Sequence, residues 1–204
     1  MPGLIPGSYQ RLVSVLNRFN GIGSKAAERM TRQLLLNPEF AQDLIAALGQ
    51  ASTLVLCPHC RVFIPMGAAF ASDSSDVDSS GTFCNYCSDA ERHSDRLLVV
   101  LDEQSARNAF DVGYKGQIWL LHQLLSPIDR IGPDDIDCSG LLRRLQVLRD
   151  RSEKFKVLLL LPDSVEGRAT TLFLQRLIEK QKVPIESPER AGLRVPETDV
   201  KEPK

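Results

Sequence analysis

Two Cys-x-x-Cys pairs constrain this chain most, because together they bring two segments that are distant in the sequence to one point. The first pair is Cys57-Pro-His-Cys60 and the second is Cys84-Asn-Tyr-Cys87. Four thiolates arranged as a pair of pairs match the tetrahedral sulfur coordination of a structural zinc site, which leaves no position open for water or substrate. Two separate redox pairs are the alternative, and we favour zinc.

Three features near these pairs receive simpler interpretations. His59 lies inside the first pair and could replace a cysteine as a ligand, but we expect it to face solvent. Cys138 stands alone, and we expect it to be a small buried residue. Residues 61–83 join the two pairs and contain Asp73-Ser-Ser-Asp-Val-Asp-Ser-Ser-Gly81, which has few apolar groups and predicts a mobile loop.

The chain carries no pattern for export or membrane insertion. Its start, Met-Pro-Gly-Leu-Ile-Pro-Gly, lacks the basic residues and apolar core of a signal peptide, and no apolar run approaches the roughly 20 residues that span a bilayer. We therefore expect a reducing, cytoplasmic environment, in which clustered cysteines bind metal before they form disulfides. The net charge of −1 excludes a general polycation, so any nucleic-acid contact requires a local basic patch.

The segment before the first cysteine predicts three short helices. The first covers residues 9–20, the second begins at Ser24 as its N-cap and runs to about Leu36, and Asn37-Pro38 separates it from the third. The first helix carries one apolar stripe, formed by Leu12, Val15, Leu16 and Phe19. The third helix is expected to direct four apolar residues inward, namely Phe40, Leu44, Ile45 and Leu48.

A glycine hairpin joins the first two of these helices. Gly21 and Gly23 flank Ile22, and the following helix carries Lys25, Arg29 and Arg32 on one face, at positions i, i+4 and i+7. The free amide groups and dipole at a helix start favour an anion such as phosphate. The pattern indicates that this segment binds the phosphate backbone of a nucleic acid. The alternative is an ordinary turn between helices whose basic face is solvated.

The second half of the chain alternates buried strands with helices. Continuous apolar runs predict strands at 97–101, 117–121 and 156–161, with a short one at 183–185, and helices at 104–111, at 138–151 and after Pro162–Glu166. This alternation predicts a parallel sheet covered on both faces. The fold class is therefore α/β with a small N-terminal all-α part.

Acidic residues follow two of these strands. Asp102 and Glu103 come after the first, and Asp163 and Glu166 come after the third. Because ligands bind at the carboxyl ends of parallel strands, these carboxylates could hold Mg²⁺. We favour the simpler interpretation, in which they are solvated loop carboxylates or charges at helix N-termini.

Three motifs resemble those of the RecR family of bacterial recombination mediators. They are Leu125-Ser-Pro-Ile-Asp-Arg-Ile-Gly-Pro-Asp-Asp-Ile136, Val165-Glu-Gly-Arg-Ala-Thr170, and Gly21-Ile-Gly-Ser-Lys25 with Arg29. The resemblance covers roughly residues 8–190. It implies a helix–hairpin–helix domain at 1–53, a Cys₄ zinc finger at 54–95, a Toprim domain at 96–186 and a flexible tail at 187–204.

The resemblance also implies a function. A RecR-like protein is a non-enzymatic DNA clamp or adaptor that works with RecO-like or RecF-like partners to load the RecA recombinase on single-stranded DNA. It binds single- and double-stranded DNA without sequence preference, is nucleoid-associated, and forms dimers or ring-shaped tetramers. The resemblance assigns DNA contact to Lys25 and Arg29 in the Gly21–Arg32 hairpin region, and one structural zinc ion to Cys57, Cys60, Cys84 and Cys87.

The sequence departs from the family pattern at the acidic positions. Asp102 stands where the family has Glu, Ala106 replaces an acid four positions later, and Asp163-Ser-Val replaces an Asp-x-Asp pair. Metal-dependent phosphoryl chemistry needs several carboxylates, so a Mg²⁺-dependent Toprim nuclease or primase is the less favoured alternative. Another alternative is a partner-docking module that has lost DNA binding. The loop between the cysteine pairs is longer than the family's, which should alter the surface near the zinc finger. The divergent C-terminal segment favours a dimer over a tetrameric ring.

Overall fold

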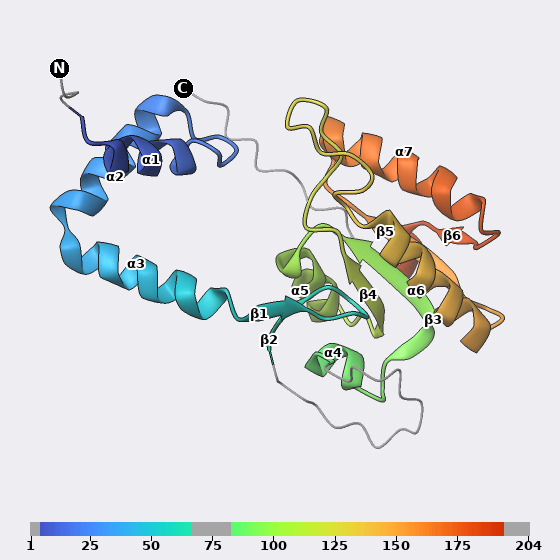
Figure 1. Ribbon diagram of the computed structural model, residues 1–204. Helices are drawn as coiled ribbons and strands as arrows, with labels where there is room; N and C mark the ends of the chain where they lie inside the picture. Colours follow the sequence, from blue (N-terminus) through green and yellow to red (C-terminus); the bar gives the residue numbers. More distant parts are fainter. Residues whose placement is uncertain (1–4, 67–82, 194–204) are drawn as a thin grey trace. The chain divides into compact units, whose positions relative to one another are not determined.

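The computed structural model describes residues 5–66 and 83–193, and the chain divides into two compact units, Met1–Leu54 and Val55–Lys204. Unit 1 contains three helices, and unit 2 contains the cysteine pairs and the parallel sheet (Figure 1). Most of the predicted mobile loop at 61–83, and the end of the predicted tail from residue 194, lie outside the described residues. None of the described helices combines the length and apolar character that crossing a bilayer requires.

Unit 1 is built from α1 (Gly7–Leu16), α2 (Ser24–Leu36) and α3 (Pro38–Ala51), with α2 in contact with both of the others. The first helix ends four residues earlier than predicted, because the amides of Arg18 and Phe19 bond to carbonyl oxygens only three residues back and tighten the chain into a turn. Gly21 then takes a left-handed conformation with φ of +78°, which glycine adopts without a Cβ penalty.

Two predictions about the helices of unit 1 are wrong. Gly23, not Ser24, is the N-cap of α2, and it provides no side-chain cap. Phe40, Ile45 and Leu48 on α3 do not face inward, since their side chains are 45%, 70% and 61% exposed. The three short helices bury one narrow seam, whose buried residues are Ala27, Thr31 and Leu34. The outer face of α3 is therefore not covered by any part of unit 1 between residues 5 and 54.

The cysteine-containing part of unit 2 is small. Strands β1 (Leu54–Leu56) and β2 (Phe63–Pro65) form a two-stranded sheet around the first cysteine pair, and α4 (Asn85–Ser88) carries the second. Strand β2 falls inside the predicted loop, because its residues pair with β1 and bury Ile64.

The main sheet of unit 2 has four strands in the order β4-β3-β5-β6, all of whose pairs are parallel. The predicted α/β class is therefore confirmed. The strands are β3 (His93–Val100), β4 (Gly116–Leu120), β5 (Lys156–Leu160) and β6 (Ile185–Glu186), and the helices are α5 (Glu103–Asp111), α6 (Cys138–Arg151) and α7 (Val165–Glu179).

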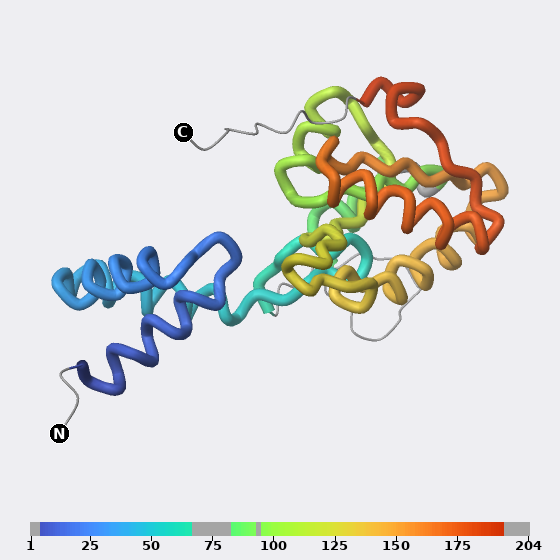
Figure 2. Tube along the Cα trace, turned by 90° about the horizontal axis from the view of Figure 1, so that it is seen from above, coloured from blue at the N-terminus to red at the C-terminus, as the bar shows by residue number. Residues whose placement is uncertain are grey.

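The two faces of this sheet have separate cores. Alternate strand residues such as Leu97 and Val99 face α6 and α7, which run along the same side of the sheet (Figures 1 and 2). Their neighbours Leu98 and Val100 face α5 and the cysteines. The continuous apolar runs are thus buried on both faces, as expected for a parallel sheet with helices on both sides.

The first part of the predicted flexible tail, residues 188–193, is structured. A short 3₁₀ helix, η1 (Pro188–Ala191), follows β6, and Leu193 is buried in the core that also contains Leu98. Burial of Leu193 therefore helps to hold this segment against the sheet.

A substitution at Gly167 tests how closely the start of α7 packs against the turn that follows β5. A Cβ at this position would meet the carbonyl oxygen of Pro162, which is backbone and has no room to move aside. We expect Gly167→Ala to lower the free energy of unfolding by about 1–3 kcal/mol, measured by urea denaturation. Gly132→Ala is the control and should have little effect, because its Cβ would lie 3.7 Å from the Asp135 carboxylate. Equal stability of the two variants would contradict this assignment.

Candidate metal centre and nucleic-acid hairpin

The four paired cysteines converge on one point in unit 2. Cys57 and Cys60 lie in a tight turn between β1 and β2, in which the Cys57 amide donates to the Val62 carbonyl at 2.8 Å and Arg61 has φ of +66°. Cys84 is the N-cap of α4, and Cys87 lies on that helix. The four Sγ atoms all lie within 4.8 Å of one another.

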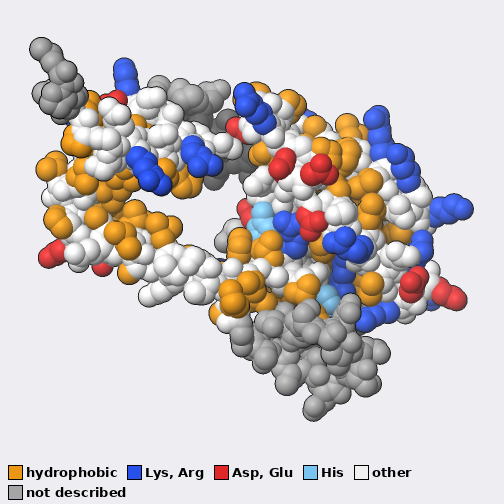
Figure 3. All heavy atoms as spheres, viewed as in Figure 1, with side chains coloured by type: hydrophobic (Ala, Val, Ile, Leu, Met, Phe, Trp, Pro, Cys, Tyr) orange, Lys and Arg blue, Asp and Glu red, His pale blue; other side chains and the backbone are white. Residues whose placement is uncertain are grey.

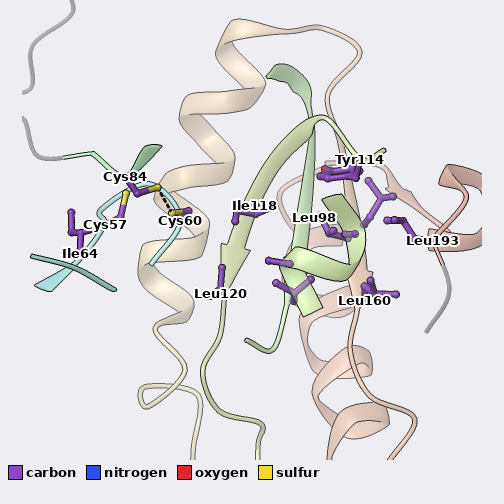
Figure 4. Close-up of a cluster of buried hydrophobic side chains, with 14 residues drawn as sticks. Cys57, Cys60, Ile64, Cys84, Leu98, Tyr114, Ile118, Leu120, Leu160 and Leu193 are labelled. Atoms are coloured by element: carbon purple, nitrogen blue, oxygen red, sulfur yellow. Dashed lines mark hydrogen bonds between the residues drawn. The ribbon is translucent and has the colours of Figure 1, made fainter. Parts of the chain in front are cut away.

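The sulfur spacing fits a tetrahedral metal site. Cys57 and Cys87 are 3.9 Å apart, and Cys60 and Cys84 are 3.2 Å apart (Figure 4 shows the second contact). A zinc ion with bonds of about 2.3 Å to sulfur requires neighbouring sulfur atoms about 3.8 Å apart. All four cysteines are free thiols, so they are not paired in disulfides. The group can therefore hold a metal ion.

Hydrogen bonds among the four thiols shift their pKa values, and the pKa values of Cys57 and Cys84 are lowered. The side-chain hydrogen bond with Cys60, followed by those with Cys84 and Cys87, lowers the pKa of the Cys57 thiol. Because a metal binds the thiolate and not the thiol, a lowered pKa favours the form of Cys57 that can bind a metal.

The first cysteine pair is fastened to the edge strand of the main sheet. The Leu120 amide donates to the Cys60 carbonyl at 2.9 Å, and His122 Nε2 lies 2.6 Å from the Arg61 carbonyl oxygen. The Arg61 guanidinium makes a 2.8 Å ion pair with Asp137 and lies over the Trp119 ring, 5.8 Å from its centroid. These contacts were not predicted from the sequence, in which the position of Arg61 directly after Cys60 is the one available signal.

Two expectations about residues near the site are wrong. His59 does not face solvent, because it is half-buried and stacks on Phe83 with ring centroids 4.1 Å apart. Burial, helped by the charge of Arg144, lowers the pKa of His59 to about 4. Cys138 is only half-buried, since it is the first residue of α6.

The predicted carboxylates occupy helix starts and a surface ion pair. Asp102 accepts a hydrogen bond from the Ser105 amide at 2.8 Å and so caps α5, whose first residue is Glu103. Asp163 accepts from Arg168 at 2.7 Å, and both side chains are exposed. Glu166 lies in the first turn of α7, which Ser164 caps. Within residues 5–66 and 83–193, the cysteine group is the one set of three or more potential metal-binding side chains close enough to share an ion.

The glycine hairpin presents a basic helix face. Lys25, Arg29 and Arg32 all lie exposed on α2, and Arg32 makes a loose pair with Glu28 at 3.9 Å. Neither Lys25 nor Arg29 takes part in an ion pair with another described residue. Without a side-chain cap, the first amides of α2 also remain available to an acceptor.

Unit 1 is electrostatically different from the chain as a whole. It contains five Lys or Arg residues and three Asp or Glu residues, whereas the net charge of the chain is −1. Figure 3 shows Lys and Arg side chains together on one face of this unit, beside a broad apolar area. This unit therefore has both the charge and the exposed surface that contact with an anionic polymer requires.

Comparison with known proteins adds a family relationship to this geometry. The chain matches no protein-family model. It is similar to curated proteins named "Recombination protein RecR". The one from Myxococcus xanthus is 33% identical over 180 residues, 86% of this chain and 81% of the relative. The one from Oenococcus oeni is 32% identical over 185 residues, 88% and 83% of the two chains, and the one from Synechococcus elongatus is 31% identical over 175 residues, 83% and 77%.

The metal assignment can be checked by elemental analysis. We expect protein purified without chelator to contain a single zinc ion per chain, and Cys60→Ser to lose most of it, because three thiolates and a hydroxyl bind zinc more weakly than four thiolates. Cys138→Ser is the control and should keep its zinc, since Cys138 is not part of the group. A folded wild-type protein without metal would refute the assignment.

Proposed function

The chain belongs to the RecR family of recombination proteins, and from this relationship we propose that it is a non-enzymatic DNA-binding clamp or adaptor in recombinational repair. Its proposed DNA contact surface is the hairpin at Gly21 and Gly23 together with Lys25, Arg29 and Arg32. The observation that carries the proposal is that Lys25 and Arg29 are exposed beside an uncapped helix start and have no ion-pair partner among the described residues.

The proposed mode of contact is with phosphate and not with bases. The basic side chains and the free amides of α2 suit phosphate oxygens, which carry no sequence information. We therefore propose binding to single- and double-stranded DNA without sequence preference. Affinity for such a ligand arises largely from counterion release and depends strongly on salt.

The absence of catalysis is also a proposal, supported by the positions of the acids. Asp102 caps α5 and Asp163 pairs with Arg168, so each already has a role that requires its carboxylate. Phosphoryl transfer with Mg²⁺ would need several carboxylates gathered around an ion. We propose that zinc is the metal held by the cysteines and that its role is structural, because four sulfur ligands leave no position for substrate.

A single copy of unit 1 offers only a few phosphate contacts, so we propose that at least two copies act on the same DNA. The exposed apolar face of α3 supports a dimer, because Phe40, Ile45 and Leu48 would be buried by a second copy of the chain. The family resemblance further suggests a nucleoid-associated protein that acts with RecO-like or RecF-like partners to load RecA on single-stranded DNA.

The proposed DNA contact can be tested with double substitutions that replace two basic residues by alanine. We expect Lys25→Ala with Arg29→Ala to weaken binding to every DNA sequence equally and to reduce the salt slope by about 2, because each lost phosphate contact removes about one unit. Affinity would be measured by fluorescence anisotropy over a salt series. Arg107→Ala with Arg176→Ala is the control, since it removes the same charge from exposed positions in unit 2. If the first pair behaved like the control, the hairpin would not be the DNA contact.

The proposed dimer face gives a separate expectation. Ile45→Glu with Leu48→Glu should convert a dimer into a monomer in size exclusion with light scattering, because buried charge opposes association. Val112→Glu with Leu172→Glu serves as the control, because these residues are exposed to a similar degree on unit 2. A dimer that survives the α3 substitutions would place the contact elsewhere.

A further inference from the structure

Arg92 joins the second cysteine pair to the main part of unit 2. It lies just before β3, its side chain is 12% exposed, and its guanidinium carbon is 4.1 Å from the centre of the Phe110 ring on α5. The same carbon is 5.3 Å from the centre of the Tyr86 ring on α4. Both rings lie within the roughly 6 Å at which a cation is attracted to an aromatic face, so one charge contacts two helices.

Two polar contacts hold the guanidinium of Arg92 in this position. Its Nη1 donates to the Gly116 carbonyl oxygen at 3.2 Å, and its Nε forms a 3.7 Å ion pair with Oδ2 of Asp89. Asp89 is the C-cap of α4, and Gly116 is the first residue of β4. The planar guanidinium can make both polar contacts while it lies against the rings, which the compact ammonium of a lysine cannot do equally well.

The contacts of Arg92 reach directly into the second cysteine pair. Tyr86 lies between Cys84 and Cys87, and its ring also packs on Phe110 with ring centroids 5.0 Å apart. Helix α4 has only four residues, and its single turn is closed where the Cys87 amide donates to the Cys84 carbonyl at 3.0 Å. Because so short a helix is not stable by itself, the contacts of Tyr86 and Arg92 fix where the pair lies.

Strand β4 thereby supports both cysteine pairs. At its start, the Gly116 carbonyl accepts from Arg92, and at its end, the Leu120 amide donates to the Cys60 carbonyl. These two points are separated by about 13 Å of extended backbone. A single strand therefore relates the first pair to the side chain that positions the second. Ligands that already converge lose less conformational freedom on binding, which raises affinity.

We propose that Arg92 is a positioning residue of the metal centre, which holds the second cysteine pair where its thiolates can share a zinc ion with those of the first pair. This inference rests on the zinc centre proposed above. Arg92 does not bind the ion itself and acts through Tyr86 and Asp89, on either side of Cys87. Residues that orient metal ligands from outside the ligand set commonly tune metal affinity in this way.

The test is zinc competition against a chromophoric chelator at pH 7. We expect Arg92→Met to weaken zinc binding by about 10- to 100-fold, the usual range for loss of a residue that supports a metal site from outside the ligand set. Arg92→Lys keeps a positive charge and a donor, so it should restore part of the affinity. Arg96→Met is the matched control, because Arg96 pairs with Glu186 on β6 at 3.5 Å and its loss should lower stability without changing zinc affinity.

A double substitution tests whether the stacking contact is the means of positioning. Phe110→Leu removes the ring that lies nearest to the Arg92 guanidinium. If both residues act through one contact, Phe110→Leu with Arg92→Met should weaken zinc binding by less than the product of the two single effects. Effects that multiply in full would show that the two residues act separately and would contradict the proposed contact.

The remaining outcomes are separated by a measurement of folding. Fluorescence of Trp119, the single tryptophan of the chain, reports whether each variant is folded. Equal zinc affinity in Arg92→Met and Arg96→Met would overturn the inference. If Arg92→Met does not fold, Tyr86→Leu replaces it, because it removes the ring of α4 that Arg92 contacts, and wild-type zinc affinity in that variant would overturn the inference equally. A wild-type protein without zinc would instead refute the metal assignment itself.

Discussion

The attachment of the cysteine group to the edge strand of the sheet is the interaction on which unit 2 depends. A segment with so few apolar residues cannot fold on a core of its own, and a bound metal would supply the missing stabilisation. In this chain the cysteines are also part of the main core, because Cys57, Cys60 and Cys84 pack with Leu98, Ile118 and other sheet residues (Figure 4). The cysteine group and the sheet therefore stabilise each other.

The hydrogen bonds that join the cysteine-containing turn to the sheet are made at the end of strand β4 and just after it. Its end, at Leu120, donates to the Cys60 carbonyl, and the following His122 reaches the Arg61 carbonyl. As the outer strand of the sheet, β4 has one side without a neighbouring strand, and the cysteine-containing turn occupies part of that side. An exposed strand edge is a site for unwanted pairing, so this arrangement protects the sheet as well as fixing the turn.

Much of the architecture could be predicted from the sequence because its signals are local. Apolar runs at 97–101, 117–121 and 156–161 correspond to β3, β4 and β5, and Pro38 begins α3 as its position after Asn37 indicated. Helix ends were less predictable. The end of α1 depends on a tightened turn before Gly21, and the N-cap of α2 moved to Gly23, since both depend on backbone geometry that several residue types permit.

The sequence by itself determined the parallel sheet, the cysteine group and the basic face of α2, because spacing along the chain is enough to specify strands, ligand pairs and a helix face. Only the tertiary structure decided which charges meet. Arg61 and Asp137 are 76 positions apart in the numbering, yet their side chains form a 2.8 Å ion pair. It also decided that the apolar face of α3 is exposed, since an apolar stripe indicates that a face needs covering but not whether the same chain covers it.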